Sequence, residues 1–292
     1  MGVDLKMACR MAKASDITYY VDRPGGMASC PFCGDMGFVA QPQSFLAHIN
    51  AALVGTTATE VIVAFRGTLP INLDDWDDFV NSVLDWVNNG DAKLTSASYT
   101  SGLVHQGFAK SLDLLWDGVL AAVEAQHAAS KLPVVVTGHS KGGALASLGA
   151  LRLQHEAAIT PVGVYTFGSA RAGNTQFAND YDGRILKDWR FENTDDLVPH
   201  LPPAAHLLPF LAAIDSRFAR LSAQAYDSVG RLEFLNWGGT LSEPKGIEEI
   251  LLEGDRLVHF GKLAATGQIQ QVAKDHSLVD AYIPAIARLA RP

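Results

Sequence analysis

The sequence Gly138-His139-Ser140-Lys141-Gly142 stands between two apolar segments with different patterns. The β-branched residues 134–137 predict a buried strand before it, and the small and aliphatic residues 143–151 predict a helix after it. A serine between two glycines at such a strand-to-helix turn meets the requirement for a nucleophile elbow, because only glycine tolerates the crowding of so sharp a turn. Ser140 is therefore the predicted nucleophile.

The composition indicates a globular chain and limits its partners. Of the 292 residues, 48% are hydrophobic and 18% are charged, which is enough apolar material to fill a sizeable core. No linker rich in Pro, Gly or Ser divides the chain, so we expect a single domain over residues 1–292. A net charge of −8 without clustered Lys and Arg argues against a nucleic-acid surface.

The sequence has no pattern that predicts a membrane span or a signal peptide. Nowhere does it hold the roughly 18 uninterrupted apolar residues that a transmembrane helix needs. Lys6, Arg10 and Lys13 lie near the N-terminus, but no apolar run between them is long enough for a signal-peptide core. We expect a soluble protein that is cytoplasmic, or secreted if a leader was removed.

The three cysteines leave more than one interpretation open. Cys30 and Cys33 form a Cys-x-x-Cys pair in a Gly-rich stretch, and Cys9 is a third sulfur. A redox motif needs a strand before it and a helix after it, and a zinc site needs a second pair of ligands. Neither is evident, so we favour reduced or locally paired structural thiols, with a disulfide or metal staple as the alternative.

Strand and helix patterns alternate along the chain, which favours a mainly parallel sheet covered by helices. The expected strands cover residues 60–65, 134–137, 162–167 and 189–193, and the expected helices cover residues 5–20 and 108–130. The carboxyl ends of parallel strands meet at one edge, so Thr68, Ser140 and the loop after Asn193 are expected to lie together. The patterns in residues 200–225 and 240–275 permit no assignment.

Five short segments stand in order within residues 60–205. They are Arg66-Gly67-Thr68, Val104-His105-Gln106-Gly107-Phe108, the Ser140 segment, Thr166-Phe167-Gly168-Ser169-Ala170-Arg171-Ala172-Gly173-Asn174 and Asn193-Thr194-Asp195-Asp196-Leu197-Val198-Pro199-His200-Leu201-Pro202. Together they resemble the successive signatures of the class 3 lipases, the fungal-lipase-like branch of the α/β hydrolases. The resemblance implies an α/β-hydrolase fold, with a mainly parallel central sheet flanked by helices and a lid-like helical segment.

A serine nucleophile needs an imidazole to take its proton and a carboxylate to orient that imidazole. The resemblance implies that the carboxylate is the Asp of the Asn-x-x-Asp-x-Val-Pro pattern, which is Asp196 rather than Asp195. It also implies a His near the C-terminus with an aromatic residue a few positions later, which fits His276. We interpret His259 as the alternative base or, more simply, as a half-buried structural residue. The remaining histidines are not favoured: His200 lies too near Asp196 in sequence, and His139 is expected to pack under the elbow.

Ester hydrolysis passes through an oxyanion that needs preorganised hydrogen-bond donors. One predicted donor is the backbone N–H of Lys141, the residue after the nucleophile, and the other is Thr68, after an earlier strand. The family often has an apolar residue in place of Lys141. We expect the stem of Lys141 to lie along the surface with its ammonium in water.

Residues 69–86 combine an apolar helical face with several aspartates. Leu73, Trp76, Val80, Val83 and Val87 share that face, and the resemblance places a lid helix here, with Trp76 and Phe79 as lid or substrate-facing residues. A fixed surface helix is the equal alternative. The aspartates lack the spacing of a calcium loop, so we expect no metal. Residues 204–214 fit either an acyl-chain pocket or ordinary buried packing.

We therefore expect a serine carboxylic ester hydrolase, in the first instance a triacylglycerol lipase, that needs no cofactor. Its expected partner is an ester lipid, possibly encountered at a lipid–water interface. An esterase for short-chain or aromatic esters and a phospholipase A1 are the alternatives within the same chemistry. A lipase-like binding module without activity is the alternative from another class, because a fold alone does not imply activity.

Overall fold

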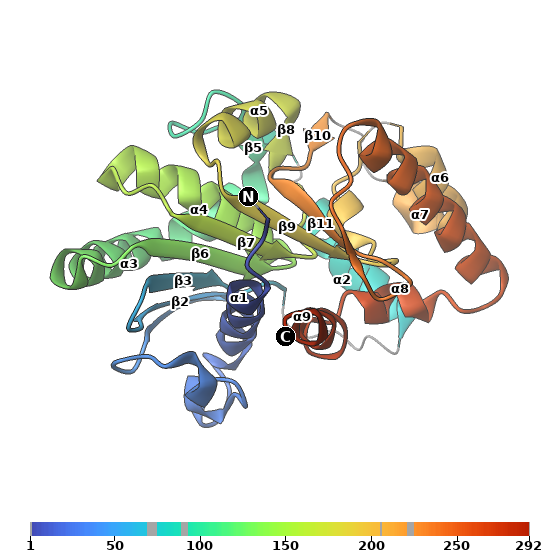
Figure 1. Cartoon of the computed structure of the whole chain (residues 1–292). Coiled ribbons are helices and arrows are strands. Elements are labelled where there is room, and N and C mark those ends of the chain that lie inside the picture. The colour runs from blue at the N-terminus through green and yellow to red at the C-terminus, as the bar shows by residue number, and fades with distance from the viewer. Residues whose placement is uncertain (1, 69–74, 89–92, 205, 221–224, 292) are drawn as a thin grey trace.

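The fold centres on one mainly parallel β-sheet (Figure 1). The structure is a computed structural model that describes residues 2–68, 75–88, 93–204, 206–220 and 225–291. Within these ranges the large sheet has eight strands in the order β1-β2-β3-β6-β7-β9-β11-β12. Their bounds are β1 Gln43–Ala47, β2 Asn50–Thr56, β3 Val61–Phe65, β6 Val134–His139, β7 Gly163–Phe167, β9 Asp188–Asn193, β11 Arg231–Leu235 and β12 Leu241–Ser242.

The central strands β3, β6, β7, β9 and β11 run parallel, whereas β1, β2 and β12 pair antiparallel at the two edges. Every residue of β3 and β6 is buried, as expected for parallel strands covered on both faces. Because these strands share one direction, the residues that follow β3, β6 and β9 gather at one edge. Thr68, Ser140 and Asp196 all belong to that edge, as the sequence predicts.

Helices cover both faces of the sheet, and a further group lies at the carboxyl end of its strands (Figure 1). The helices are α1 Leu5–Ile17, α2 Trp76–Asn88, α3 Gln106–Ser130, α4 Lys141–Ala157, α5 Thr175–Arg184, α6 Leu208–Ile214, α7 Ile247–Ala265, α8 Gln270–Asp275 and α9 Ile283–Leu289. One hydrophobic core packs α3 and α4 against the sheet, and another packs α1 and α9 against the opposite face. A small antiparallel sheet, β10-β8-β5-β4, comprises β4 Leu94–Ser96, β5 Leu103–His105, β8 Gly173–Asn174 and β10 Tyr226–Asp227.

The turn between β6 and α4 has the geometry of a nucleophile elbow. Ser140 adopts φ 60° and ψ −133°, a strained conformation for a residue with a side chain. A Cβ added to Gly138 would lie 2.0 Å from the carbonyl oxygen of Gly142, and one added to Gly142 would lie 2.2 Å from that of Phe65. The two glycines are required because the backbone of the turn packs directly against itself and against the end of β3.

The expected strands correspond to β3, β6, β7 and β9, and the expected helices correspond to α1 and α3. The first helix ends at Ile17 and continues as a 3₁₀ turn over Thr18–Tyr20. Residues 240–275, left unassigned from the sequence, include α7 and α8. Strands β1, β2 and β11 were not foreseen from the sequence. The division into domains stays a prediction.

We predict that Gly142→Ala lowers the free energy of unfolding by about 3 kcal/mol, because the new methyl group meets rigid backbone rather than a movable side chain. Urea denaturation followed by circular dichroism measures the loss. Gly183→Ala is the matched control, because a Cβ there meets nothing within 4 Å. Its free energy of unfolding should stay within about 1 kcal/mol of the parent, on the stabilising side. Equal stability of the two variants would contradict the close packing of the elbow.

Candidate active site

Asp196 and His276 form a buried hydrogen-bonded pair, although 80 residues separate them in sequence. Asp196 lies in the loop after β9, and His276 caps the C-terminus of α8. Nδ1 of His276 lies 3.0 and 2.9 Å from the two carboxylate oxygens. Because an ionised carboxylate only accepts hydrogen bonds, Nδ1 carries a proton, which in the neutral imidazole leaves the lone pair on Nε2. The ring is thus held in the tautomer that a general base needs.

Further hydrogen bonds hold the carboxylate of Asp196. The hydroxyl of Tyr282 donates to Oδ2 at 2.7 Å, and the backbone N–H of Val198 donates to Oδ1 at 2.9 Å. Burial alone would raise the pKa of Asp196, but the charge and hydrogen bond of His276, together with these two donors, hold it below its usual value. The aromatic residue anticipated after His276 therefore fixes the acid rather than the base.

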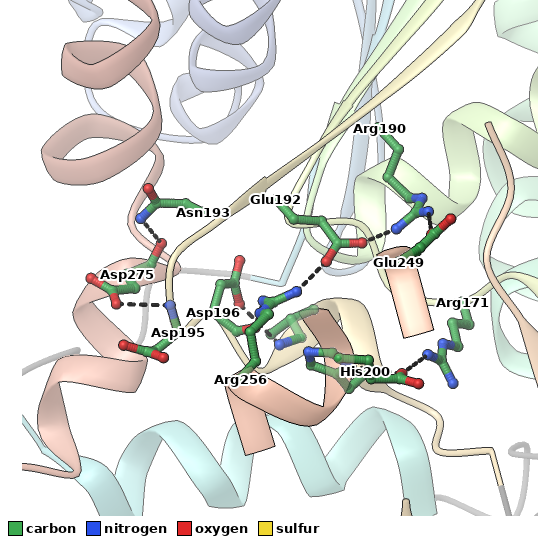
Figure 2. Close-up of polar contacts among 12 residues, drawn as sticks. Arg171, Arg190, Glu192, Asn193, Asp195, Asp196, His200, Glu249, Arg256 and Asp275 are labelled. Carbon is green, nitrogen blue, oxygen red and sulfur yellow. Dashed lines mark hydrogen bonds and ion pairs between the residues drawn. The ribbon is translucent and has the colours of Figure 1, made fainter. Parts of the chain in front are cut away.

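The backbone of Asp196 is tied to α7 by a buried chain of alternating charges (Figure 2). Nη2 of Arg256 donates to the carbonyl oxygen of Asp196 at 2.5 Å, and its Nη1 pairs with Glu192 on β9. Glu192 also pairs with Arg190, which binds Glu249 on α7 at 2.6 Å. Buried charges are costly unless they are paired, so this network fixes how α7 sits against β9 and the Asp196 loop. Arg256 cannot be identified from the sequence, because no motif marks it.

Ser140 lies at the N-terminus of α4, against the loop that follows β3. A Cβ added to Gly67 would lie 2.8 Å from Cβ of Ser140. The ring of the neighbouring His139 stacks on the ring of His276, with centroids 4.6 Å apart. Among the described residues no hydrogen bond joins the Ser140 hydroxyl to His276, and Ser140 is 5% exposed. The serine and the imidazole therefore share one edge, but the contact for proton transfer is not preformed.

His139 packs beneath the elbow and supports His276. Its Nε2 donates to the backbone carbonyl of His276 at 2.9 Å, and its Nδ1 accepts from the hydroxyl of Tyr19 at 2.8 Å. Burial and the neighbouring His276 lower the pKa of His139 to about 3, so its ring is neutral at physiological pH. Tyr19, which follows α1, was not identified from the sequence, because a tyrosine after a helix carries no catalytic signal.

A second Asp-His pair lies next to the first. Nδ1 of His259 lies 2.7 Å from Oδ2 of Asp195, which also accepts from Nε1 of Trp237 at 3.0 Å. The side chain of His259 is 39% exposed, in line with the half-buried structural residue expected from the sequence. His200, also considered as a base, is buried and bonds to Glu253 instead. Neighbouring aspartates thus serve different histidines.

Of the two positions predicted to bind the oxyanion, Lys141 directly follows Ser140, and Thr68 follows Gly67, whose backbone packs against Ser140. The backbone N–H of Lys141 begins α4, where the first N–H groups of a helix have no partner within the helix. The hydroxyl of Thr68 is buried and has no hydrogen-bond partner in the part of the chain that the structure describes. A buried hydroxyl without a hydrogen-bond partner lowers the stability of the fold, and a bound ligand could supply the missing partner.

The side chain of Lys141 contradicts the expectation that its ammonium points to water. The residue is 4% exposed, and its Nζ donates to Oδ1 of Asn50 on β2 at 2.8 Å. Burial, with the neighbouring charge of Arg66, lowers the pKa of Lys141 to about 8. The first turn of α4 packs against the sheet, so the aliphatic stem of Lys141 points inward and does not extend along the surface.

Helix α2 covers the candidate site. Phe79 is fully buried and meets the ring of His276 edge-on, with centroids 6.1 Å apart. Trp76 packs on Phe79, and its indole N–H donates to Asp215 at 3.2 Å. Leu73, predicted on the same helical face, lies outside the described residues. The predicted lid or fixed helix therefore closes over the imidazole in this state.

A model of the family described as Lipase (class 3) matches residues 62–206, a range that includes Ser140 and Asp196. The chain belongs to the class 3 lipase family. It is 33% identical over 146 residues to the secreted mono- and diacylglycerol lipase 1 of Fusarium solani, covering 49% of this chain and 40% of that protein. It is 30% identical over 219 residues to a lipase of Rhizomucor miehei, covering 68% of this chain and 56% of the relative.

A solved structure of a triacylglycerol lipase, described as having a serine protease triad at its catalytic centre, matches with a TM-score of 0.61 and 26% identity. The match covers 79% of this class 3 lipase and 80% of that chain. The α/β-hydrolase fold predicted from the sequence is thereby confirmed. The chain spans less than two thirds of both curated relatives. His276 lies beyond the range of the family model, so its position beside Asp196 comes from the three-dimensional structure alone.

The remaining expectations concern the cysteines and residues 204–214 of this class 3 lipase. Cys9, Cys30 and Cys33 are free thiols, which agrees with the favoured interpretation as structural thiols. Leu207 and Leu211 are fully buried in the core around α3 and α4, whereas Phe210 is 54% exposed. Ordinary packing therefore accounts for the first two leucines.

We predict that the stability of the parent rises relative to Lys141→Met as the pH increases from 8 to 10.5. In this window the unfolded chain still holds the proton that the folded chain releases, because the pKa is about 8 when folded and 10.5 ordinarily. The difference in free energy of unfolding between the two proteins should change by a few kcal/mol. Urea titrations at several pH values measure it, with the exposed Lys187→Met as control. A pH-independent difference would show that folding does not lower the pKa of Lys141.

We predict that Tyr282→Phe lowers the free energy of unfolding at pH 7 by about 1–3 kcal/mol, because the buried carboxylate of Asp196 loses one of its donors and the N–H of Asn193 loses its acceptor. The loss should shrink at low pH, because protonation of Asp196 removes the charge that the hydroxyl stabilises; the pKa of Asp196 is held below its usual value in the folded parent, so this protonation needs a pH below the ordinary carboxyl range. Urea denaturation at pH 7 and pH 3 measures both values. Tyr165→Phe is the control, since its hydroxyl bonds to no described residue; a loss as large there would reject the specific role of Tyr282.

Proposed function

We propose that this protein is a serine carboxylic ester hydrolase acting on ester lipids, and specifically a triacylglycerol lipase. The observation that carries the proposal is the buried Asp196–His276 pair at the same sheet edge as a serine on a strained elbow. Its membership of the class 3 lipases and the names of the relatives support a lipid substrate. Because the chain spans only part of those relatives, the activity and the substrate are inferences.

In the proposed reaction the Ser140 hydroxyl attacks the ester carbonyl while Nε2 of His276 takes its proton. Asp196 stabilises the imidazolium that forms, since it accepts from Nδ1 through both oxygens. The backbone N–H groups of Lys141 and Thr68 stabilise the oxyanion, and such a donor is worth about 3 kcal/mol in the transition state. The protonated His276 then gives its proton to the leaving alcohol, and an acyl group remains on Ser140.

Water completes the cycle. His276 takes a proton from a water molecule, which attacks the acyl carbonyl, and the same oxyanion donors serve again. Collapse of this second intermediate releases the fatty acid and returns the proton to Ser140. Each proton passes through Nε2, so the Nδ1 tautomer held by Asp196 matters at both stages.

The substrate reaches Ser140 only after α2 has moved, in this proposal. Phe79 packs on His276 and Ser140 is almost fully covered, so the described conformation corresponds to a closed state. Opening would expose the apolar face of α2 and bring Ser140 and His276 into hydrogen-bond distance, because catalytic contacts often tighten only with substrate bound. Trp76 and Phe79 are the residues that such a movement would present to the lipid.

Short-chain or aromatic esters and phospholipids are the alternative substrates, because the same triad would cleave all of them. A binding module without activity is the alternative outside this chemistry. Within the described residues no helix has both the length and the apolar character needed to cross a membrane. The cellular compartment stays a prediction.

We predict that Ser140→Ala, His276→Ala and Asp196→Asn each lower kcat/KM on emulsified triolein and on p-nitrophenyl butyrate by on the order of a thousandfold or more. The matched controls are His259→Ala and Asp195→Asn, which alter the neighbouring Asp-His pair. They should stay within about threefold of the parent, because they leave the reacting groups in place.

The outcome on different substrates separates the alternatives. Greater activity on long-chain emulsions than on soluble esters supports a lipase, and preference for phosphatidylcholine supports a phospholipase. No hydrolysis by the folded parent, or full activity in Ser140→Ala, would reject the proposed mechanism. A large loss in His259→Ala with none in His276→Ala would reassign the base.

A further inference from the structure

Helix α7 carries an apolar stripe that faces solvent. Ile247, Ile250, Leu251 and Val258 have exposed fractions of 73%, 69%, 63% and 60%. Their spacing places them on one side of the helix, and the exposed residues Gly254, Gly261 and Ala265 continue the same side to its end. We name these seven residues the α7 stripe. It contains no charged or hydrogen-bonding side chain over the whole length of α7.

The α7 stripe is not needed to hold the helix in place. The opposite side of α7 packs on the protein through Leu257, Phe260 and Leu263, together with the ion-paired Arg256. A surface helix normally presents polar residues to water, because its apolar side faces the core. Here both sides are apolar, and a large exposed apolar surface marks a place of interaction. The stripe is therefore a candidate interaction surface.

Helix α7 is attached directly to the candidate active site. Arg256 donates to the backbone of Asp196, and His259 binds Asp195, so the helix holds both aspartates of that loop. Figure 1 places α7 with α2, α6 and α8 at the end of the molecule where the parallel strands terminate. Phe210 on the adjacent α6 is a further exposed apolar residue. A partner bound to the stripe would thus meet the end of the molecule that holds Ser140 and His276.

The charges around the α7 stripe indicate what kind of surface it fits. Its flanks carry the exposed Glu248 and Asp255 and a single cation, Lys262, and the whole chain has a net charge of −8. A helix that lies on an anionic membrane is normally rich in Lys and Arg beside its apolar side. An uncharged lipid surface needs no such cations. The flanks therefore disfavour an anionic bilayer and are compatible with a neutral one.

We infer that the α7 stripe docks this protein onto the surface of a neutral ester lipid, with the proposed catalytic edge turned toward that surface. The inference rests on the proposed function for the identity of the lipid. It differs from lid opening, because the stripe is already exposed while α2 is closed over His276. Docking through α7 would precede any movement of α2 and would hold the enzyme where its substrate is concentrated.

The test uses flotation of the full chain with a triolein emulsion stabilised by phosphatidylcholine. Every protein carries Ser140→Ala, so binding is measured without hydrolysis. The double substitution Ile250→Glu and Leu251→Glu should lower the bound fraction roughly tenfold or more, because two apolar side chains can no longer leave water. Leu186→Glu is the matched control: Leu186 is 69% exposed but precedes β9, at the opposite end of the strands.

Three outcomes would overturn the docking inference. They are equal binding of the double variant and its parent, an equal loss of binding in Leu186→Glu, and dissociation of a parent dimer by the double variant without any change in lipid binding. The last would assign the stripe to a second copy of this chain. Tighter binding to phosphatidylserine vesicles than to the neutral emulsion would overturn the choice of lipid. Thermal melting checks that each variant folds, and the single variant Ile247→Ser repeats the test if the double variant does not.

The docking inference and the proposed function can fail separately. A parent that floats with the emulsion but hydrolyses no ester would retain the docking surface and reject the enzyme. A parent that hydrolyses soluble and emulsified esters, but whose binding ignores the stripe, would retain the enzyme and reject the docking surface.

Discussion

The direct contact of backbone with backbone at the elbow is the constraint on which the site depends. The carbonyl oxygen of Phe65 occupies the place where a side chain at position 142 would begin, so β3, β6 and the first turn of α4 approach one another without intervening side chains. This approach brings Gly67 against Ser140 and sets the N–H of Lys141 beside the loop that carries Thr68. The strained φ of Ser140 persists because the parallel strands on both sides over-determine the turn. The same backbone contact therefore positions the nucleophile and both predicted oxyanion donors.

The other half of the site is assembled by buried polar groups instead of by close packing. His276 is held from three directions: its ring by Asp196, its backbone carbonyl by His139, and its ring face by stacking on the same His139. Asp196 is itself held through Tyr282 and through Arg256, which belongs to the charge network of α7 (Figure 2). Each of these groups would be costly if left unpaired, so the network favours one arrangement of α7, α8 and the Asp196 loop.

Lys141 differs from these groups, because no oppositely charged group pairs with it among the described residues. Its ammonium is buried with an amide as its only described partner, and its lowered pKa records that cost.

Two helices near the candidate site differ in where their apolar sides face. Helix α2 turns its apolar side inward, onto His276, and so closes the site to water. Helix α7 turns an apolar side outward while its other side anchors the aspartate loop. This arrangement fits a protein whose proposed substrate forms a separate lipid phase. The α7 stripe could attach to that phase while α2 still covers His276.

The sequence alone determined the features that depend on local periodicity or on a short motif. The strand before Ser140, the two glycines around it and the mainly parallel sheet follow from β-branched runs, the crowding of the turn and the alternation of elements. The resemblance to class 3 lipases singled out Asp196 within its loop.

Only the tertiary structure decided which residues far apart in the sequence are in contact. Asp195 and Asp196 are neighbours, yet their side chains leave the loop in different directions and bind His259 and His276, which lie 64 and 80 residues away. The direction of a loop side chain depends on what packs against the loop, and here that is α7 and α8, which the sequence patterns did not reveal. The inward course of Lys141 and the support of His139 by Tyr19 arose in the same way, because burial is a property of the assembled layers and not of a residue's type.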